Sequence, residues 1–160
     1  MSAVQTINFR EASIQEDNLI AQHFYQLWRD NDVAPESIRS DWLEIVLEFN
    51  KQARQNLYYK AFVAEVDGKV IGSASCQLFT GLYPHILTEE HRKFGYIWGV
   101  YVDLDYRGQG IAKQLTSMAI DYLKAIACTR VILHASPAGK PVYERLGFVP
   151  NNEMRLDTID

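Results

Sequence analysis

The sequence lacks the features that would place the protein in a membrane or in an oxidising compartment. None of its apolar runs approaches the roughly 18 residues that a membrane-spanning helix needs. The N-terminal residues Met1–Gln5 lack the basic and then apolar pattern of a signal peptide. Cys76 and Cys128 are the two cysteines, and their apolar surroundings predict buried thiols without a disulfide. Together these absences predict a cytoplasmic protein.

Several activities are disfavoured because the residues that they need are missing. The net charge is −4 and lysine and arginine form no cluster, so neither a nucleic acid nor a membrane is expected as a partner. The chain has no Gly-x-Ser-x-Gly sequence for a serine hydrolase. Its four histidines and two cysteines show no spacing typical of metal ligands, so no metal is expected.

The composition that remains is that of one globular domain over residues 1–160, with 48% apolar and 22% charged residues. Apolar patterns predict strands at residues 6–10, 62–66, 69–79, 97–102 and 130–134, with one or two more between 148 and 156. Helices are predicted after the Ser13–Glu16 capping box, with Pro35 in a first turn, from Ile111 and near 139–146. The strand, helix and strand between 97 and 134 indicate a right-handed crossover between parallel strands, and the irregular segment 80–94 indicates a loop or lid.

The most informative stretch is Arg107-Gly108-Gln109-Gly110-Ile111-Ala112, which joins an expected strand to an expected helix. Its two glycines leave backbone N–H groups uncovered at the positive end of the helix dipole, which favours a phosphate or pyrophosphate. A dinucleotide loop would need a third glycine where Lys113 stands, and a Walker loop would need Gly-Lys followed by Ser or Thr. The pattern that remains is Arg-x-x-Gly-x-Ala.

This pattern resembles the acetyl-CoA-binding motif of the GNAT acyltransferase superfamily. A second signature of that family, Tyr-x-x-x-Gly-Phe, matches Tyr143 to Phe148. The resemblance covers residues 95–156 well. It implies an α/β fold of the GNAT type, with a central, mixed but mostly antiparallel sheet that splays at two parallel strands and about four flanking helices. It also implies acetyl-CoA as the acyl donor.

In the GNAT family the loop before the helix holds the pyrophosphate, and a bulged strand hydrogen-bonds the pantetheine arm. The resemblance therefore implies twelve coenzyme-binding residues, which are Val100, Tyr101, Val102, Arg107, Gly108, Gln109, Gly110, Ile111, Ala112, Lys113, Ser136 and Gly139. Ser136 and Gly139 stand where many members carry Asn and Ala. Gly99 interrupts its strand as a bulge would, and a freed backbone N–H near Tyr101 or Val102 would stabilise the oxyanion.

Tyr143 is implied as the general acid, because the tyrosine of the family motif lies beside the coenzyme sulfur. A phenol with a pKa near 10 is protonated at neutral pH and can donate to the leaving thiolate. An aromatic core residue is the structural alternative for Tyr143. The base that deprotonates the amine stays open among four residues, each of which also has an ordinary structural explanation. They are Glu65, Asp103, His134 and His85.

The leading hypothesis is an enzyme that transfers acetyl from acetyl-CoA to a primary amine by direct attack. The alternatives are an acyl-CoA-binding regulatory or interaction module with little catalysis, and the same fold with a longer acyl donor. The acceptor would be a small-molecule amine or a protein or peptide amine, and a homodimer is compatible with either. Candidate residues for the acceptor pocket are Trp28, Trp42, Tyr58, Tyr59, Tyr83 and Glu89.

Overall fold

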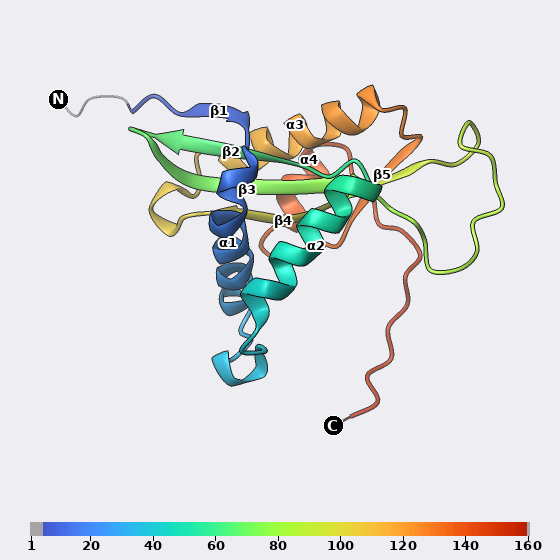
Figure 1. The fold of residues 1–160 in the computed structure, drawn as a ribbon, viewed down its shortest axis with the longest axis horizontal. Coiled ribbons are helices and arrows are strands. Elements are labelled where there is room, and N and C mark those ends of the chain that lie inside the picture. Colours follow the sequence, from blue (N-terminus) through green and yellow to red (C-terminus); the bar gives the residue numbers. More distant parts are fainter. Residues whose placement is uncertain (1–4, 160) are drawn as a thin grey trace.

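A five-stranded sheet runs through the centre of the molecule (Figure 1). The computed structural model describes residues 5–159. The strands follow their sequence order across the sheet and are β1 (Asn8–Glu11), β2 (Lys60–Val66), β3 (Lys69–Leu78), β4 (Phe94–Val102) and β5 (Arg130–Leu133). Neighbouring strands are antiparallel except β4 and β5, which are parallel. This topology confirms the predicted mixed sheet with one parallel pair.

Helices cover both faces of the sheet (Figure 1). On one face lie α1 (Asp17–Asp30) and α2 (Trp42–Asn56), with α1 in contact with β4 and with α2. On the other face α3 (Ile111–Ala125) packs on β2, β3 and β4, and the short α4 (Lys140–Arg145) follows β5. Because α3 lies between two parallel strands in the chain, it forms the crossover that the sequence predicts.

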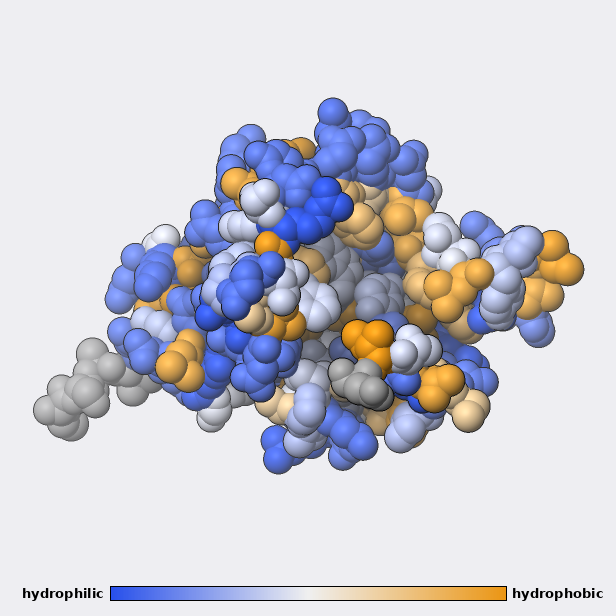
Figure 2. Space-filling view, turned by 90° about the horizontal axis from the view of Figure 1, so that it is seen from below, coloured by the Kyte–Doolittle hydropathy of each residue, from blue (hydrophilic) through white to orange (hydrophobic). Residues whose placement is uncertain are grey.

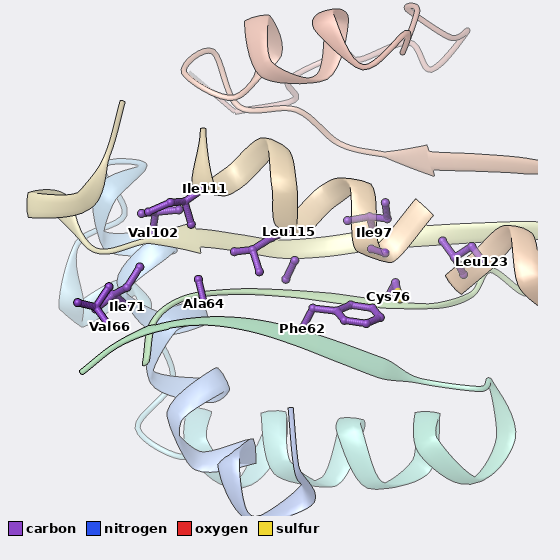
Figure 3. Packing of buried hydrophobic residues seen from close by; sticks show 12 residues of the cluster. Phe62, Ala64, Val66, Ile71, Cys76, Ile97, Val102, Ile111, Leu115 and Leu123 are labelled. Atoms are coloured by element: carbon purple, nitrogen blue, oxygen red, sulfur yellow. The ribbon is translucent and has the colours of Figure 1, made fainter. Parts of the chain in front are cut away.

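The main core lies between α3 and the sheet (Figure 3). Ile111, Leu115 and Leu123 recur at helical spacing and are 2%, 0% and 0% exposed. They meet apolar side chains of the strands, among them Phe62 and Ile97. This packing fixes α3, and therefore its N-terminus, against the strand ends.

Local signals explain where several elements start and stop. Asp67 and Gly68 have φ of 51° and 79°, the two left-handed residues of a type I′ turn, so the predicted hairpin between β2 and β3 is confirmed. The capping box is also present, since the backbone N–H of Ser13 donates to the Glu16 carboxylate at 2.9 Å. It opens a single 3-10 turn, Ile14–Glu16, that leads directly into α1.

Pro35 does not lie in the first turn of α2, so that prediction is wrong. It begins a separate 3-10 turn, Pro35–Ser37, and the extended backbone of Ile38 (φ −100°, ψ 131°) interrupts the helical path. The helix starts only at Trp42, after Asp41 as its N-cap residue. The Asp41 carboxylate makes no capping hydrogen bond to the helix and instead accepts two hydrogen bonds from the Arg39 guanidinium.

The prediction of one or two strands between 148 and 156 is also wrong, because residues 149–159 form neither helix nor strand. Pro150 cannot donate to a strand ladder, and Asn151 and Asn152 are weak strand formers. The segment leaves the sheet (Figure 1), and Met154 is 94% exposed. The irregular loop before β4 is confirmed and also projects from the body, with apolar side chains on its surface (Figure 2).

Both cysteines are free thiols. Cys76 is fully buried, and burial raises the pKa of its thiol to about 12. Cys128 is only half-buried, so the prediction of a buried thiol is wrong for this residue. Within residues 5–159, no helix combines the length and the apolar character needed to cross a membrane.

Replacing Leu115 with alanine should lower the free energy of unfolding by about 2–5 kcal/mol, because it empties a fully enclosed site between α3 and the sheet. Urea denaturation followed by circular dichroism measures this change. Lys124→Ala, at an exposed position of the same helix, should change the stability by less than about 0.5 kcal/mol. Equal effects of the two substitutions would contradict the assigned core.

Candidate active site

Strand β4 separates from β5 partway along its length. The two strands pair only where Phe94 to Ile97 lie opposite Arg130 to Leu133, although β4 continues to Val102. Beyond Ile97 the edge of β4 that faces β5 has no strand partner among the described residues. Backbone N–H and C=O groups on such an edge are free to bind an extended ligand.

A β-bulge on the other edge of β4 coincides with this separation. Trp98 pairs with Ser75 and Tyr101 with Ser73, so Gly99 and Val100 together lie opposite a single residue of β3. Gly99 has φ +64°, a conformation that L side chains rarely adopt. The predicted bulge is therefore present, and it turns β4 away from its parallel neighbour.

A cavity of about 960 Å³ occupies the opening between the separated strands. One wall consists of residues 134–138 after β5 and Tyr143 of α4. The facing wall consists of side chains from α1, α2 and β4, and Gly99 and Val100 lie between the two walls. Such a cavity is large enough for a small ligand or for the end of a long one.

The N-terminus of α3 offers a second binding feature. Gly110 is the N-cap residue and has φ +79°, and the first helical hydrogen bond runs from Gln114 N–H to Gly110 O at 3.1 Å. In the part of the chain that the structure describes, the backbone N–H groups of residues 108–113 have no carbonyl partner. The first turn holds Lys113 and no acidic residue. The free donors, the helix dipole and the lysine together favour an anion.

Arg107 braces this loop against the rest of the site. Its Nε donates to the carbonyl oxygen of Val102 at 2.8 Å, and its Nη2 donates to the Asp30 carboxylate at 2.7 Å. The same guanidinium lies 5.6 Å from the centre of the Tyr101 ring. The side chain therefore joins the end of β4 to the end of α1 and fixes the start of the loop.

Tyr143 belongs to the wall opposite α1 and α2. Its ring packs edge-on against Phe148 with 5.9 Å between the ring centres, and burial raises the pKa of its phenol. A Cβ atom on Gly139 would lie 2.9 Å from the Tyr143 ring, so glycine leaves the space that the ring occupies. Ser136 Oγ accepts a hydrogen bond from Gly139 N–H at 3.2 Å. The structure thus brings Ser136, Gly139 and Tyr143 together.

Of the four candidates for the base, His134 lines the cavity and the other three do not. Glu65 accepts hydrogen bonds from Asn8 and Arg10 on the β1 side of the sheet. Asp103 directly follows the last residue of β4, and its backbone N–H donates to the carbonyl oxygen of Ile71. His85 lies in the projecting loop and bonds the carbonyl oxygen of a loop neighbour.

His134 is the middle member of a hydrogen-bonded chain. Its Nε2 lies 2.5 Å from a Glu153 carboxylate oxygen, which can only accept, so Nε2 carries the proton when the ring is neutral. Its Nδ1 then accepts from the Tyr96 hydroxyl at 2.7 Å. Tyr96 also lines the cavity, and burial raises the pKa of its phenol.

Sequence reasoning missed Tyr96 and Glu153. Tyr96 has a weak signal, because Phe94, Tyr96 and Trp98 alternate along one strand and so share a face of the sheet. Glu153 has none, because it lies in an irregular segment 19 residues beyond His134. Of the expected acceptor residues, only Trp28 lines the cavity; Trp42, Tyr58, Tyr59, Tyr83 and Glu89 do not.

Comparison with known proteins identifies the family of the chain. The model of the Acetyltransferase (GNAT) family matches residues 21–148. The chain belongs to the GNAT family. A glucosamine 6-phosphate N-acetyltransferase of Trypanosoma brucei brucei is 30% identical over 148 residues, which cover 92% of this chain and 95% of the relative. An N-alpha-acetyltransferase of Arabidopsis thaliana is 33% identical over 93 residues, which cover 55% of this chain and 44% of the relative.

A solved GNAT structure agrees with the fold. A predicted acetyltransferase of Clostridium acetobutylicum, solved with acetyl-CoA, superposes with a TM-score of 0.80 at 25% identity and covers 95% of this chain and 96% of that one. The GNAT chain described here is therefore an N-acetyltransferase, and acetyl-CoA is its acyl donor. The free N–H groups before α3 and the open edge of β4 fit such a donor. Among residues 5–159 no three histidine, cysteine or acidic side chains gather as a metal site.

His23 of α1 supports the bulged strand from the helix side of this GNAT site. Its Nδ1 lies 2.8 Å from Ser73 Oγ, and its ring centre lies 4.8 Å from that of Tyr101. The ring is 6% exposed, and burial lowers its pKa. The folded protein therefore resists protonation of His23.

This burial predicts an acid-sensitive contribution to stability. Below about pH 6.5 the unfolded chain protonates His23 while the folded chain does not, so the free energy of unfolding should fall as the pH falls. Urea denaturation at pH 7.5, 6.5 and 5.5, as assay settings about one unit apart around that pKa, measures the loss. In the His23→Gln variant the free energy of unfolding should fall less over the same pH range. Parallel losses in the two proteins would show that His23 is not the group responsible.

Proposed function

We propose that the protein acetylates a primary amine that binds on the α1 and α2 side of the cavity. The observation that carries this proposal is one continuous cavity that reaches the bulge of β4, Tyr143 and His134. The donor would enter from the α3 side and the acceptor from the side of α1 and α2. The two reactants would then meet where the parallel strands separate.

Two parts of the site would bind acetyl-CoA, the acyl donor. The backbone N–H groups of residues 108–113 would bind the pyrophosphate, and the open edge of β4 at residues 100–102 would bind the pantetheine arm. Arg107 would act by holding the loop, because its guanidinium already binds Val102 and Asp30. Ser136 and Gly139 would form the opposite side of the pantetheine channel.

The transfer itself needs one bond made and one broken. The neutral amine nitrogen attacks the acetyl carbonyl carbon, and a backbone N–H of the bulged segment stabilises the oxyanion. As the carbon–sulfur bond breaks, the departing thiolate takes the proton of the Tyr143 hydroxyl. The nitrogen loses a proton in forming the amide, and this proton restores the tyrosine through solvent. The products are the N-acetyl amine and free coenzyme A.

The chain from Tyr96 to Glu153 is proposed to take the proton of the incoming ammonium group. Tyr96 lines the cavity, and its hydroxyl would accept the ammonium proton while its own proton passes to His134 Nδ1. Glu153 would stabilise the positive charge that forms on the ring. This arrangement favours His134 over the other three candidates for the base. It makes Tyr96 the group that passes the proton from the amine to His134, and Glu153 a positioning residue that acts through His134.

Two acceptor classes come from the relatives. The Trypanosoma relative is named for glucosamine 6-phosphate and matches nearly the whole chain, which supports a small amino sugar phosphate as a candidate. The Arabidopsis relative is named for N-alpha acetylation and matches about half the chain, which supports a protein N-terminus. Thiol release from acetyl-CoA, measured with a panel containing both kinds of amine, tests the proposed enzyme. Coenzyme binding without thiol release for any amine would instead favour a binding module.

Tyr143→Phe should lower kcat by about a hundredfold or more, because the thiolate loses its proton donor while the ring is kept. The dissociation constant of coenzyme A should stay the same within about a factor of two, since the phenyl ring keeps its contacts. Because burial raises the pKa of Tyr143, the wild-type kcat should not decline up to about pH 10 through ionisation of this group. Full turnover by the variant at every pH would remove Tyr143 from the mechanism.

Lys113→Glu should weaken coenzyme A binding about fivefold at low salt, because it places a negative charge in the first turn of α3 beside the phosphate site. Isothermal titration calorimetry at two salt concentrations measures the effect, which should shrink as salt is added. Lys124→Glu makes the same charge change at the other end of α3 and should leave binding unchanged. Equal weakening by both variants would argue against an anion site at the N-terminus of α3.

A further inference from the structure

The wall of the cavity formed by α1, α2 and β4, called the acceptor wall below, is centred on the indole of Trp98. Phe24 and Phe49 meet this ring edge-on, with ring centres 5.0 Å and 5.5 Å away. The indole N–H donates to Gln77 Oε1 at 2.9 Å, which fixes the ring in the plane that these contacts require. Aromatic side chains from α1, α2 and β4 therefore form one rigid surface, which Gln77 of β3 orients.

Part of this wall is left uncovered by the protein. Trp28, Ile45 and Phe49 line the cavity and are 49%, 43% and 46% exposed. Large apolar side chains gathered in a hollow mark a surface that a ligand covers, because water contact with them is unfavourable. The view in Figure 2 shows the molecular surface hollowed near its centre, with apolar side chains at the rim.

The charges around the cavity select against an anionic acceptor. Of the described residues that line it, none is lysine or arginine, and the carboxylates are Asp30 and Asp32 at the C-terminal end of α1. Arg107 comes close to this region, but it and Asp30 form an ion pair at 2.7 Å, in which the two charges offset each other. Asp32 is the lining carboxylate outside this pair. The end of a helix also carries a partial negative charge. A phosphate or carboxylate on the acceptor would meet no cation here, whereas an ammonium group would be attracted.

We infer that the acceptor is a primary amine joined to an aromatic or large apolar body, and that amines carrying a phosphate or carboxylate are poor acceptors. Of the two candidate classes above, this inference sets aside the amino sugar phosphate for which the Trypanosoma relative is named. The apolar body would lie on the surface formed by Trp28, Phe49 and Trp98, and its amine would point toward Tyr96 and the bulge of β4. The inference rests on the proposed function, since the same cavity must admit the acetyl thioester. The amine can belong to a free arylalkylamine or to a peptide whose first residue is aromatic.

The test is a pair of amines that share the ethylamine unit, 2-phenylethylamine and O-phosphoethanolamine. Their kcat/KM values come from thiol release with saturating acetyl-CoA. The value for 2-phenylethylamine should be about tenfold higher or more, as burial of one phenyl ring allows. A value for O-phosphoethanolamine that equals or exceeds it would overturn the inference. The tripeptide amide Phe-Gly-Gly-NH2 distinguishes the two sources: it should react faster than 2-phenylethylamine only if the natural acceptor is a peptide.

A charge placed on the wall should shift this preference. Phe49→Arg removes an aromatic surface and supplies the missing cation, so it should raise the KM for 2-phenylethylamine and lower that for O-phosphoethanolamine, each by about threefold or more. Ile14→Arg is the control, because Ile14 is 62% exposed and lies outside the cavity. An unchanged ratio of the two KM values in Phe49→Arg would contradict the assigned acceptor wall.

A binding measurement separates failure of this inference from failure of the proposed function. Trp28 and Trp98 line the wall, so 2-phenylethylamine should quench tryptophan fluorescence to saturation when coenzyme A is bound, and O-phosphoethanolamine should not. Saturable quenching without thiol release would contradict the proposed function and leave the acceptor class standing. A higher kcat/KM for O-phosphoethanolamine than for 2-phenylethylamine would contradict the inferred acceptor class and leave the proposed function standing. Absence of both quenching and turnover with 2-phenylethylamine would overturn the inference.

Discussion

Strands β4 and β5 pair over only four residues, and the rest of the site depends on the place where that pairing stops. A fully paired parallel sheet would close the gap, and the backbone groups of residues 100–102 would be consumed in a ladder. The bulge at Gly99 turns β4 aside at this point. It therefore creates a cavity and frees hydrogen-bonding groups along one wall of it.

The elements around the gap are held by polar contacts that join distant parts of the chain. Arg107 ties the end of β4 to α1, and His23 supports the neighbouring strand from the same helix. Gly139 leaves the room in which the Tyr143 ring lies. These contacts keep the donor loop, the bulged strand and the proposed acid at fixed separations, which a direct transfer between two bound reactants requires.

The donor half of the site could be predicted from the sequence, and the acceptor half could not. The loop before Ile111 and the motif that starts at Tyr143 each have a local spacing, because one helix start or one short helix fixes their geometry. The hydrogen-bonded chain through His134 instead joins residues 38 and 19 positions apart, and only the folded sheet brings them together. The aromatic acceptor wall likewise joins residues far apart in the sequence, Phe24, Phe49 and Trp98, which only the folded structure brings together.

Errors about the fold arose where local patterns competed with tertiary context. Pro35 suits the start of a helix, but the extended backbone of Ile38 ends its 3-10 turn, and α2 starts only at Trp42. In the segment 149–159 only Met154 and Leu156 have the two-residue spacing that suits a strand, and Pro150 and the two asparagines after it disfavour one. Strong turn chemistry, as at Asp67, was a more dependable signal than apolar spacing alone.

Hydrogen–deuterium exchange with and without coenzyme A tests most directly whether the gap between β4 and β5 is the donor site. Coenzyme A bound in the gap should slow exchange in two segments, residues 99–102 on the open edge of β4 and residues 108–113 before α3, with no change in β1 and β2. Protection of the loop at 108–113 alone would contradict the proposal that the open edge of β4 binds the pantetheine arm. Tight binding of coenzyme A with unchanged exchange in both segments would show that the gap between β4 and β5 is not the donor site.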